Sequence, residues 1–253
     1  MKTATDIRKE AREALTGKWG KAVAISLIYA LVTFIMNKIS SYFDGNLLGS
    51  ILSIVFAIIE VPLGFGLMIS FIKLKRSEEV EVIDFLKDGF SNFKRAWGVS
   101  LNVLLKMIVP IILMIVVTVL CIVSLGGAIF FSNQAITSDG NLALLQTGSA
   151  GLVLLFVVLY IVCGIYATIK GLLYYVANYI AYDNPEMTTK EAVEKSAELM
   201  KGKRGDLFLL TLSFIGWAIL SVCSLGIGFL WLVPYVNVAM VCFYENLINK
   251  TEE

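Results

Sequence analysis

The sequence predicts an all-α membrane protein, a polytopic bundle of about six transmembrane helices arranged as three hairpins. Of its 253 residues, 58% are apolar and only 16% are charged, whereas soluble domains average about 45–50% and about 25%. The mean hydropathy is +0.80. Long runs with almost no charge alternate with short basic segments, which is the pattern expected when lipid surrounds most of the chain.

Four spans are located by runs in which charges are rare. A helix of about 20 apolar residues crosses a hydrocarbon core of about 30 Å. Glu60 is the one charge in the second run and Lys170 the one charge in the fourth, while the first and third runs have none. The four runs cover residues 22–37, 47–72, 107–131 and 151–181.

The last uncharged run, residues 207–244, is too long for one span. As a single helix it would measure about 57 Å, nearly twice the thickness of the core. The segment "SLGIGF" places Gly226 and Gly228 near the middle of the run, where a turn is needed. We therefore expect two spans here, and a re-entrant hairpin is the alternative because each arm is short.

The distribution of basic residues predicts which side of the membrane each loop occupies. Nineteen of the 21 Lys and Arg residues lie in residues 1–21, 73–106, 190–204 and the C-terminal tail, and cytoplasmic segments carry an excess of these residues. The loop at 132–150 has none. An even number of spans with both termini in the cytoplasm fits this asymmetry.

Three amphipathic helices are expected on the cytoplasmic side. Thr3 with Asp6, and Thr188 with Glu191, have the spacing of capping boxes at two helix starts. Helical spacing relates three sets of apolar residues: Ile7, Ala11, Leu15 and Trp19; Ile83, Leu86, Phe90, Phe93 and Trp97; and Val193, Ala197 and Met200. These helices either lie on the membrane surface, with Trp19 and Trp97 as interfacial anchors, or pack as a ring on the inner ends of the spans.

An internal repeat organises what we predict to be a single membrane domain, residues 1–253. The segments "TGKWGKAV", "FKRAWGVS" and "KGKRGDLF" each join an amphipathic helix to an outward span. In the returning spans, Pro62, Lys170 and Pro234 each lie nine residues before an aromatic residue, Phe71, Tyr179 and Phe243 respectively. The repeats would be residues 1–76, 77–186 and 187–250.

Glu60 is the most informative residue of the sequence. It lies about 20 Å from the outer end of its span, and a charge at the bilayer centre costs about 2.5–3.5 kcal/mol. Either burial keeps it neutral, or it pairs with a cation, for which Lys170 is the first candidate and Lys106 the second. Pro62 blocks a backbone hydrogen bond to the carbonyl of Ile58 and predicts a kink.

Small residues and a second proline complete the candidate site. Gly64 and Gly66 follow the kink and allow another helix to approach closely, and Pro234 occupies the matching position of the last span. A kinked helix with a carboxylate is typical of ion pathways, and it also accommodates a structural ion pair. Both interpretations of Glu60 and Lys170 stay open.

Several classes of function are disfavoured. The chain has no His and four Cys, all within apolar runs, so we expect no metal or other cofactor. It has no recognisable catalytic motif, and we expect that it is not an enzyme. A net charge of +1 makes nucleic acid an improbable partner.

Two roles remain. The first is a non-catalytic membrane scaffold or assembly partner, which would contact the lipid bilayer and another membrane protein or a second copy of the chain. The second is a small transporter or channel that uses the region of Glu60 and Lys170.

Several motifs carry a resemblance to a known family. The segments "LMKGKRGDLFLLTLSFIGW", "GIGFLWLVPY" and "FYENL", with "AREALTGKWGKAV" and "YYVANYIAYDNP", resemble the bacterial integral membrane proteins grouped as domain of unknown function 975. The resemblance covers nearly the whole chain. It implies a location in the bacterial cytoplasmic membrane, and it implies no activity and no catalytic residue.

Overall fold

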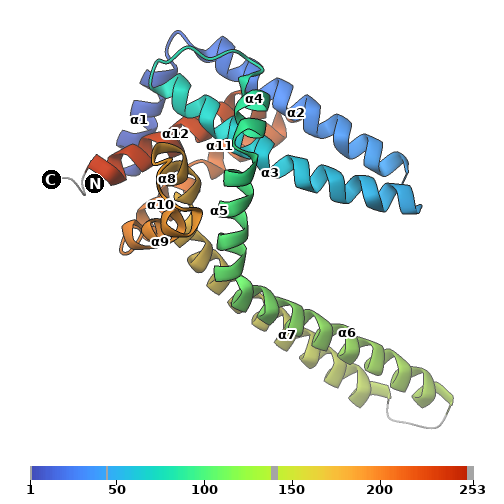
Figure 1. Cartoon of the computed structure of the whole chain (residues 1–253). Helices are drawn as coiled ribbons and strands as arrows, with labels where there is room; N and C mark the ends of the chain where they lie inside the picture. The colour runs from blue at the N-terminus through green and yellow to red at the C-terminus, as the bar shows by residue number, and fades with distance from the viewer. Residues whose placement is uncertain (1, 44, 138–141, 250–253) are drawn as a thin grey trace. The chain divides into compact units, whose positions relative to one another are not determined.

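A computed structural model describes residues 2–43, 45–137 and 142–249, with the side chains of 128–150 left out. Every element in these ranges is a helix (Figure 1). Six helical segments are long and apolar enough to cross a membrane, which confirms the predicted all-α polytopic class. They are α2 (Trp19–Tyr42), α3 (Leu47–Lys75), α6 (Ile108–Thr137), α7 (Leu142–Gly171), α10 with α11 (Arg204–Leu212 and Ile215–Cys223) and α12 (Phe229–Asn249).

The contacts divide the chain into two compact units. The second unit, Val103–Leu172, contains α6 and α7 packed against each other as a hairpin. The first unit contains Met1–Asn102 and Leu173–Glu253. It also holds most of the shorter helices: α1 (Ala4–Leu15), α4 (Asp84–Ser91), the start of α5 (Phe93–Lys106), η1 (Leu172–Tyr174) from its second residue, α8 (Ala177–Asp183) and α9 (Thr189–Leu199).

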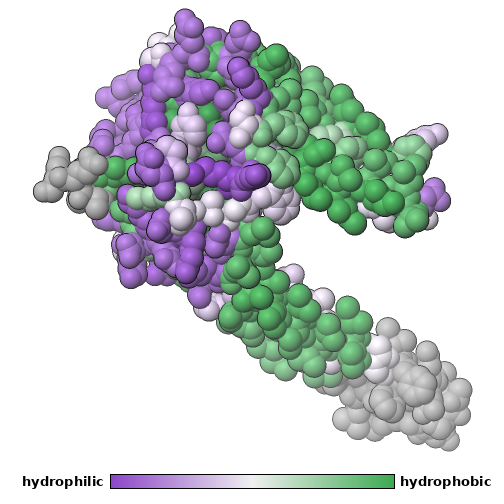
Figure 2. All heavy atoms as spheres, viewed as in Figure 1, coloured by the Kyte–Doolittle hydropathy of each residue, from purple (hydrophilic) through white to green (hydrophobic). Residues whose placement is uncertain are grey.

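Apolar side chains cover the outside of the long hairpins. Phe34 of α2 is 58% exposed and Ile54 of α3 is 62% exposed, and Figure 2 shows continuous apolar surface along this hairpin. A helix that is apolar on its exposed face is stable only where lipid or protein covers that face. The long hairpins are therefore the membrane-embedded part of the fold.

The core of the first unit lies where the short helices pack on the ends of the long ones. α1 packs on α12, α4 on α3, and α9 on α8. Each receiving helix contributes one buried aromatic residue, and these are Phe71, Tyr179 and Phe243. We call α1, α4 and α9, together with the ends of α3, α8 and α12 that they contact, the collar.

The first and third short helices begin as predicted. In α1, the Thr3 amide donates to Asp6 Oδ2 at 3.0 Å and the Asp6 amide donates to Thr3 Oγ1 at 3.3 Å. In α9, the matching distances between Thr188 and Glu191 are 2.9 and 3.2 Å. Both capping boxes are confirmed, because they depend on residues only three positions apart.

The prediction for the second short helix is wrong in two respects. The segment forms two helices, α4 and α5, which meet at Asn92. Ile83 and Phe90, expected on the apolar face, are 55% and 49% exposed, whereas Phe85, outside the predicted set, is fully buried. Gly89 is buried beside Phe85, on the face of α4 that packs on α3.

Two glycines determine which face of α4 packs against α3. A Cβ on Gly66 would lie 1.9 Å from the carbonyl oxygen of Phe85, and a Cβ on Gly89 would lie 2.4 Å from that of Pro62. Only glycine permits the backbones of α3 and α4 to approach so closely. The apolar pattern did not reveal this contact, because glycine contributes little to such a pattern.

The third long helix extends beyond its predicted span, whereas the fourth begins earlier than predicted and ends at Gly171 instead of residue 181, followed by η1 and α8. α6 continues to Thr137 and α7 begins at Leu142, so much of the segment 132–150 that we expected to be a loop is helical. Uncharged polar residues end an apolar run without ending a helix, which explains the difference. The turn between α11 and α12 does fall within 224–229, with Gly226 at φ +88°.

Candidate intramembrane polar site

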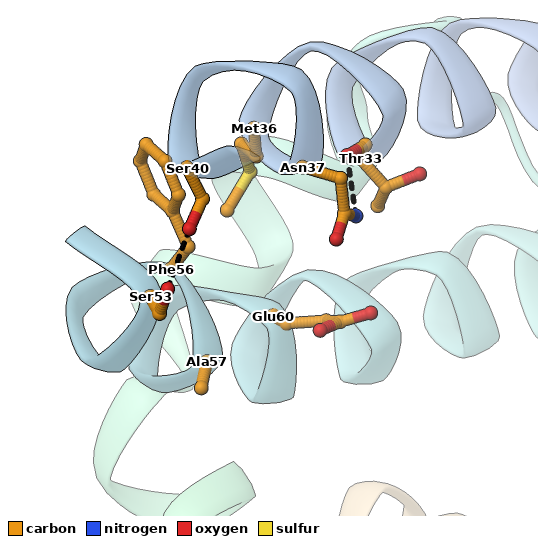
Figure 3. A pocket seen from close by; sticks show the side chains of 8 residues that line it. All are labelled: Thr33, Met36, Asn37, Ser40, Ser53, Phe56, Ala57 and Glu60. Atoms are coloured by element: carbon orange, nitrogen blue, oxygen red, sulfur yellow. Dashed lines mark hydrogen bonds between the residues drawn. The ribbon is translucent and has the colours of Figure 1, made fainter. Parts of the chain in front are cut away.

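Glu60 lines a cavity of about 240 Å³ between α2 and α3. Figure 3 shows its side chain between the two helices, together with the side chains that surround it. Oxygen-bearing residues form most of the lining: Thr33, Asn37, Ser40, Ser53 and Glu60, with Met36, Phe56 and Ala57 completing it.

Helical spacing explains how these residues meet. Thr33, Asn37 and Ser40 are separated by four and three positions, and so are Ser53, Ala57 and Glu60. Residues at such spacings share one face of a helix. The α2–α3 hairpin turns these two faces toward each other, so that polar side chains from both helices line one cavity.

Hydrogen bonds fix several of these groups. The hydroxyls of Ser40 and Ser53 share a hydrogen bond of 2.5 Å that joins the two helices. The Asn37 amide nitrogen donates to the Thr33 carbonyl at 2.8 Å, which leaves the Asn37 side-chain oxygen available to a ligand. Within the described part of the chain, no hydrogen bond or ion pair is made by the Glu60 carboxylate.

The chemistry of the cavity suits a small hard cation or a proton. Its polar groups are one carboxylate, one amide and three hydroxyls, and oxygen ligands of this kind prefer hard cations. A single carboxylate balances one positive charge. Among the described residues, no group of three or more His, Cys, Asp or Glu side chains could hold a metal ion.

Pro62 lies about half a helical turn after Glu60. Because proline has no amide hydrogen, it cannot donate the usual helical hydrogen bond to the carbonyl of Ile58. The Ile58 carbonyl accepts a hydrogen bond of 3.0 Å from the indole nitrogen of Trp97 in α5. Trp97, expected to be an interfacial anchor, thus supplies the donor that Pro62 lacks. Sequence reasoning identified the unpaired carbonyl and missed its partner, because Trp97 lies 39 residues away.

The predicted glycines and the second proline occupy distinct places. A Cβ on Gly64 would lie 3.9 Å from the Tyr29 hydroxyl, an ordinary contact across the hairpin. Gly66 forms the close contact with α4 described above. Pro234 is buried inside α12, and Gly228, just before α12, lies so near Ser221 that a Cβ there would be 2.7 Å from the Ser221 Cα.

Lys170 belongs to α7, in the other compact unit. Its ammonium lies 5.7 Å from the centre of the Tyr166 ring, one turn earlier in the same helix. A contact of this length is a cation–π interaction. The pairing of Lys170 with Glu60 stays a prediction, which recovery of the folded yield by exchanging the two residues would test.

A family model described as a protein of unknown function, DUF975, matches residues 1–251. The chain belongs to the DUF975 family. The resemblance expected from the sequence motifs is thereby confirmed. No curated protein and no solved structure matches this DUF975 chain.

The DUF975 chain also contains a charged cluster that sequence reasoning missed. Arg76, at the end of α3, donates to both carboxylate oxygens of Asp183 at 2.8 and 2.7 Å and to Glu245 at 3.2 Å. Lys75 pairs with Glu245 as well. The hydrogen bonds that Arg76 donates to Asp183 raise the pKa of its guanidinium, against a smaller opposing effect of burial.

This cluster joins the ends of α3, α8 and α12, and α1 extends it. The Glu10 carboxylate of α1 accepts hydrogen bonds from Lys2 at 2.8 Å and from Asn246 at 3.1 Å. The only sequence signal was that Asp183 and Glu245 come directly after apolar runs, within "YDNP" and "FYENL". The basic residues indicate the orientation of the chain in the membrane, and the sequence does not indicate which acidic residues pair with them.

Proposed function

We propose that this DUF975 protein is a small membrane transporter or channel that carries a proton or a monovalent cation at Glu60. The observation that supports the proposal is the oxygen-lined cavity around this carboxylate. If Glu60 had only a structural role, apolar side chains could pack α2 against α3 without leaving a cavity. The polar cavity between these helices instead provides room for an ion and its ligands.

The energetics favour an occupied site. An isolated charge within a membrane span costs about 2.5–3.5 kcal/mol or more, and binding of one cation or one proton removes that cost. Asn37 and the hydroxyls of Thr33, Ser40 and Ser53 replace part of the hydration of the ion. Pro62 removes one helical hydrogen bond of α3, and Trp97 supplies the missing donor to Ile58, so the carboxylate lies next to an interruption of the α3 hydrogen-bond ladder.

Flux into proteoliposomes tests this role. If the purified protein carries protons, it should dissipate a pH gradient in the absence of Na⁺. If it carries a metal cation, it should take up Na⁺ at constant pH. We expect Glu60→Gln to reduce the active flux at least tenfold. Glu13→Gln, which removes an exposed carboxylate from α1, is the matched control and should retain the flux. No flux above that of empty liposomes, or equal flux in both variants, would contradict the proposal.

The second candidate is the scaffold or assembly role expected from the sequence. It is favoured by the Glu60 carboxylate having no partner within the described residues, because a basic side chain of another transmembrane helix could pair with it. A cysteine at position 60, in a background without the four native cysteines, separates the two roles. Reaction with a water-soluble reagent supports the transporter, and protection that depends on a co-purified membrane protein supports the scaffold.

A further inference from the structure

A second cavity, of about 400 Å³, lies in the first unit between the start of α2 and the α11–α12 hairpin. Three of the four tryptophans in the sequence line it: Trp19, Trp217 and Trp231. Trp217 and Trp231 are 52% and 51% exposed. Leu220, Leu232, Tyr235, Ser221, Gly228 and Arg12 complete the lining, so the cavity is a mainly apolar, aromatic trough open to its surroundings.

Tyr235 connects this trough to α1. Its ring lies 6.3 Å from the ring of Trp19 and 5.1 Å from that of Phe214, measured between ring centres. Its hydroxyl donates to the Arg8 carbonyl at 3.1 Å. This contact holds α1 against α12, and Arg12, one turn after Arg8, comes to lie on the rim of the cavity.

The charged residue that the structure places on the rim is basic. Arg12 is the charged residue of the lining and is exposed, and its guanidinium makes no ion pair or hydrogen bond within the described residues. One turn away, Arg8 donates to the Ser213 carbonyl at 3.3 Å, while its Nε is buried without a partner. By contrast, Lys9 on the same helix is 4.0 Å from Glu13.

We infer that this cavity binds one anionic phospholipid, with the phosphate at Arg12 and the glycerol and acyl chains against Trp19, Trp217 and Trp231. Tryptophan favours the boundary between headgroups and acyl chains. Arg binds phosphate oxygens through two parallel hydrogen bonds. The trough has apolar walls and a cationic rim, so it complements a lipid with a negatively charged headgroup. A zwitterionic lipid fits the trough less well, because its headgroup has no net negative charge.

Quenching of tryptophan fluorescence by brominated lipids tests the inference directly, because three of the four tryptophans line the cavity. The full-length protein is reconstituted with increasing fractions of brominated phosphatidylglycerol or brominated phosphatidylcholine. We expect half-maximal quenching at a several-fold lower fraction of phosphatidylglycerol. Arg12→Gln should reduce this preference about fivefold, since one basic residue near the surface contributes about that factor in anionic-lipid binding.

Two matched variants separate a specific site from general attraction. Lys9→Gln removes the same charge from the same helix outside the cavity and should keep the preference. Arg12→Lys restores the charge without the two parallel hydrogen bonds and should recover only part of the preference. Arg12 is exposed, so the thermal unfolding of Arg12→Gln should match that of the wild type. Equal quenching by the two lipids, or equal loss in Arg12→Gln and Lys9→Gln, would overturn the inference.

Discussion

Arg95 shows how one side chain completes the end of a helix. Its guanidinium donates to the carbonyls of Ala181, Asn184, Pro185 and Met187 at 2.5–3.0 Å. The last carbonyls of a helix have no partner within it, and a cation also interacts favourably with the helix dipole. In α3, Lys18 has the same role, donating to the Leu74 carbonyl at 2.9 Å. In two of the three predicted joints, a basic residue before the glycine thus caps the end of another helix.

We expect Arg95→Met to lower the free energy of unfolding by about 2–3 kcal/mol, because it leaves several part-buried carbonyls without a charged donor. Lys94→Met removes the neighbouring charge, which is exposed, and should change the free energy by less than about 0.5 kcal/mol. Unfolding of the purified protein by denaturing detergent measures both. Similar values for the two variants would show that the Arg95 contacts contribute nothing.

The segment of α3 around Pro62 is supported by two other elements. Pro62 leaves the Ile58 carbonyl without its helical donor, and the indole of Trp97 in α5 replaces that donor. Gly66 and Gly89 hold α4 against the same part of α3 through backbone contact. The proline-containing segment beside Glu60 is therefore held by neighbouring helices, and the predicted kink there stays a prediction.

A double-mutant cycle measures this support. Trp97→Phe keeps the aromatic ring and removes the donor, and we expect it to cost about 1 kcal/mol of stability. In a Pro62→Ala background the same change should cost clearly less, because the amide of an alanine at 62 donates to the Ile58 carbonyl. An equal cost in both backgrounds would mean that the hydrogen bond does not compensate for the proline.

The collar closes on itself, since α1 at the start of the chain packs on α12 at its end. The charged cluster follows the same path: Arg76 of α3 contacts Asp183 and Glu245, and Glu10 of α1 contacts Asn246 of α12. Helices from all three predicted repeats meet there. The repeat boundaries stay a prediction.

Acid should weaken the collar. Burial acts to raise the pKa of Glu10, but hydrogen bonds from Lys2 and Asn246 and the charges of Lys2 and Lys75 outweigh it and lower the pKa below its ordinary value of 4.5. A lowered pKa in the folded state contributes stability that is present above pH 4.5 and is lost as the pH falls through the lowered pKa. Thermal unfolding between pH 7 and pH 3 should show this loss.

Glu10→Gln isolates the contribution of that carboxylate. The variant should be less stable than the wild type at pH 7, and the difference should shrink as the pH falls below 4.5. Glu13→Gln, on the exposed face of α1, should follow the wild type throughout. A Glu10→Gln difference that stays constant with pH would argue against the linkage.

Much of the fold could be predicted because its signals are local. Span positions depend on the composition of about 20 consecutive residues, and the capping boxes at Thr3 and Thr188 depend on pairs three positions apart. Glu60 and Pro62 could also be recognised, since a charge and a missing amide are conspicuous in an apolar run. The faces of α4 could not, because Gly66 and Gly89 carry no hydrophobic signal.

By itself, the sequence determined that lipid is the solvent of the long helices, where those helices run, and which residues in them are out of place. The tertiary structure decided which groups meet: Ser40 with Ser53 beside Glu60, Trp97 with Ile58, and Glu10 with Asn246, 236 residues apart. The physical reason is that partition into lipid adds up along a segment, whereas a hydrogen bond requires two particular atoms within about 3 Å. Helix packing alone brings such atoms together.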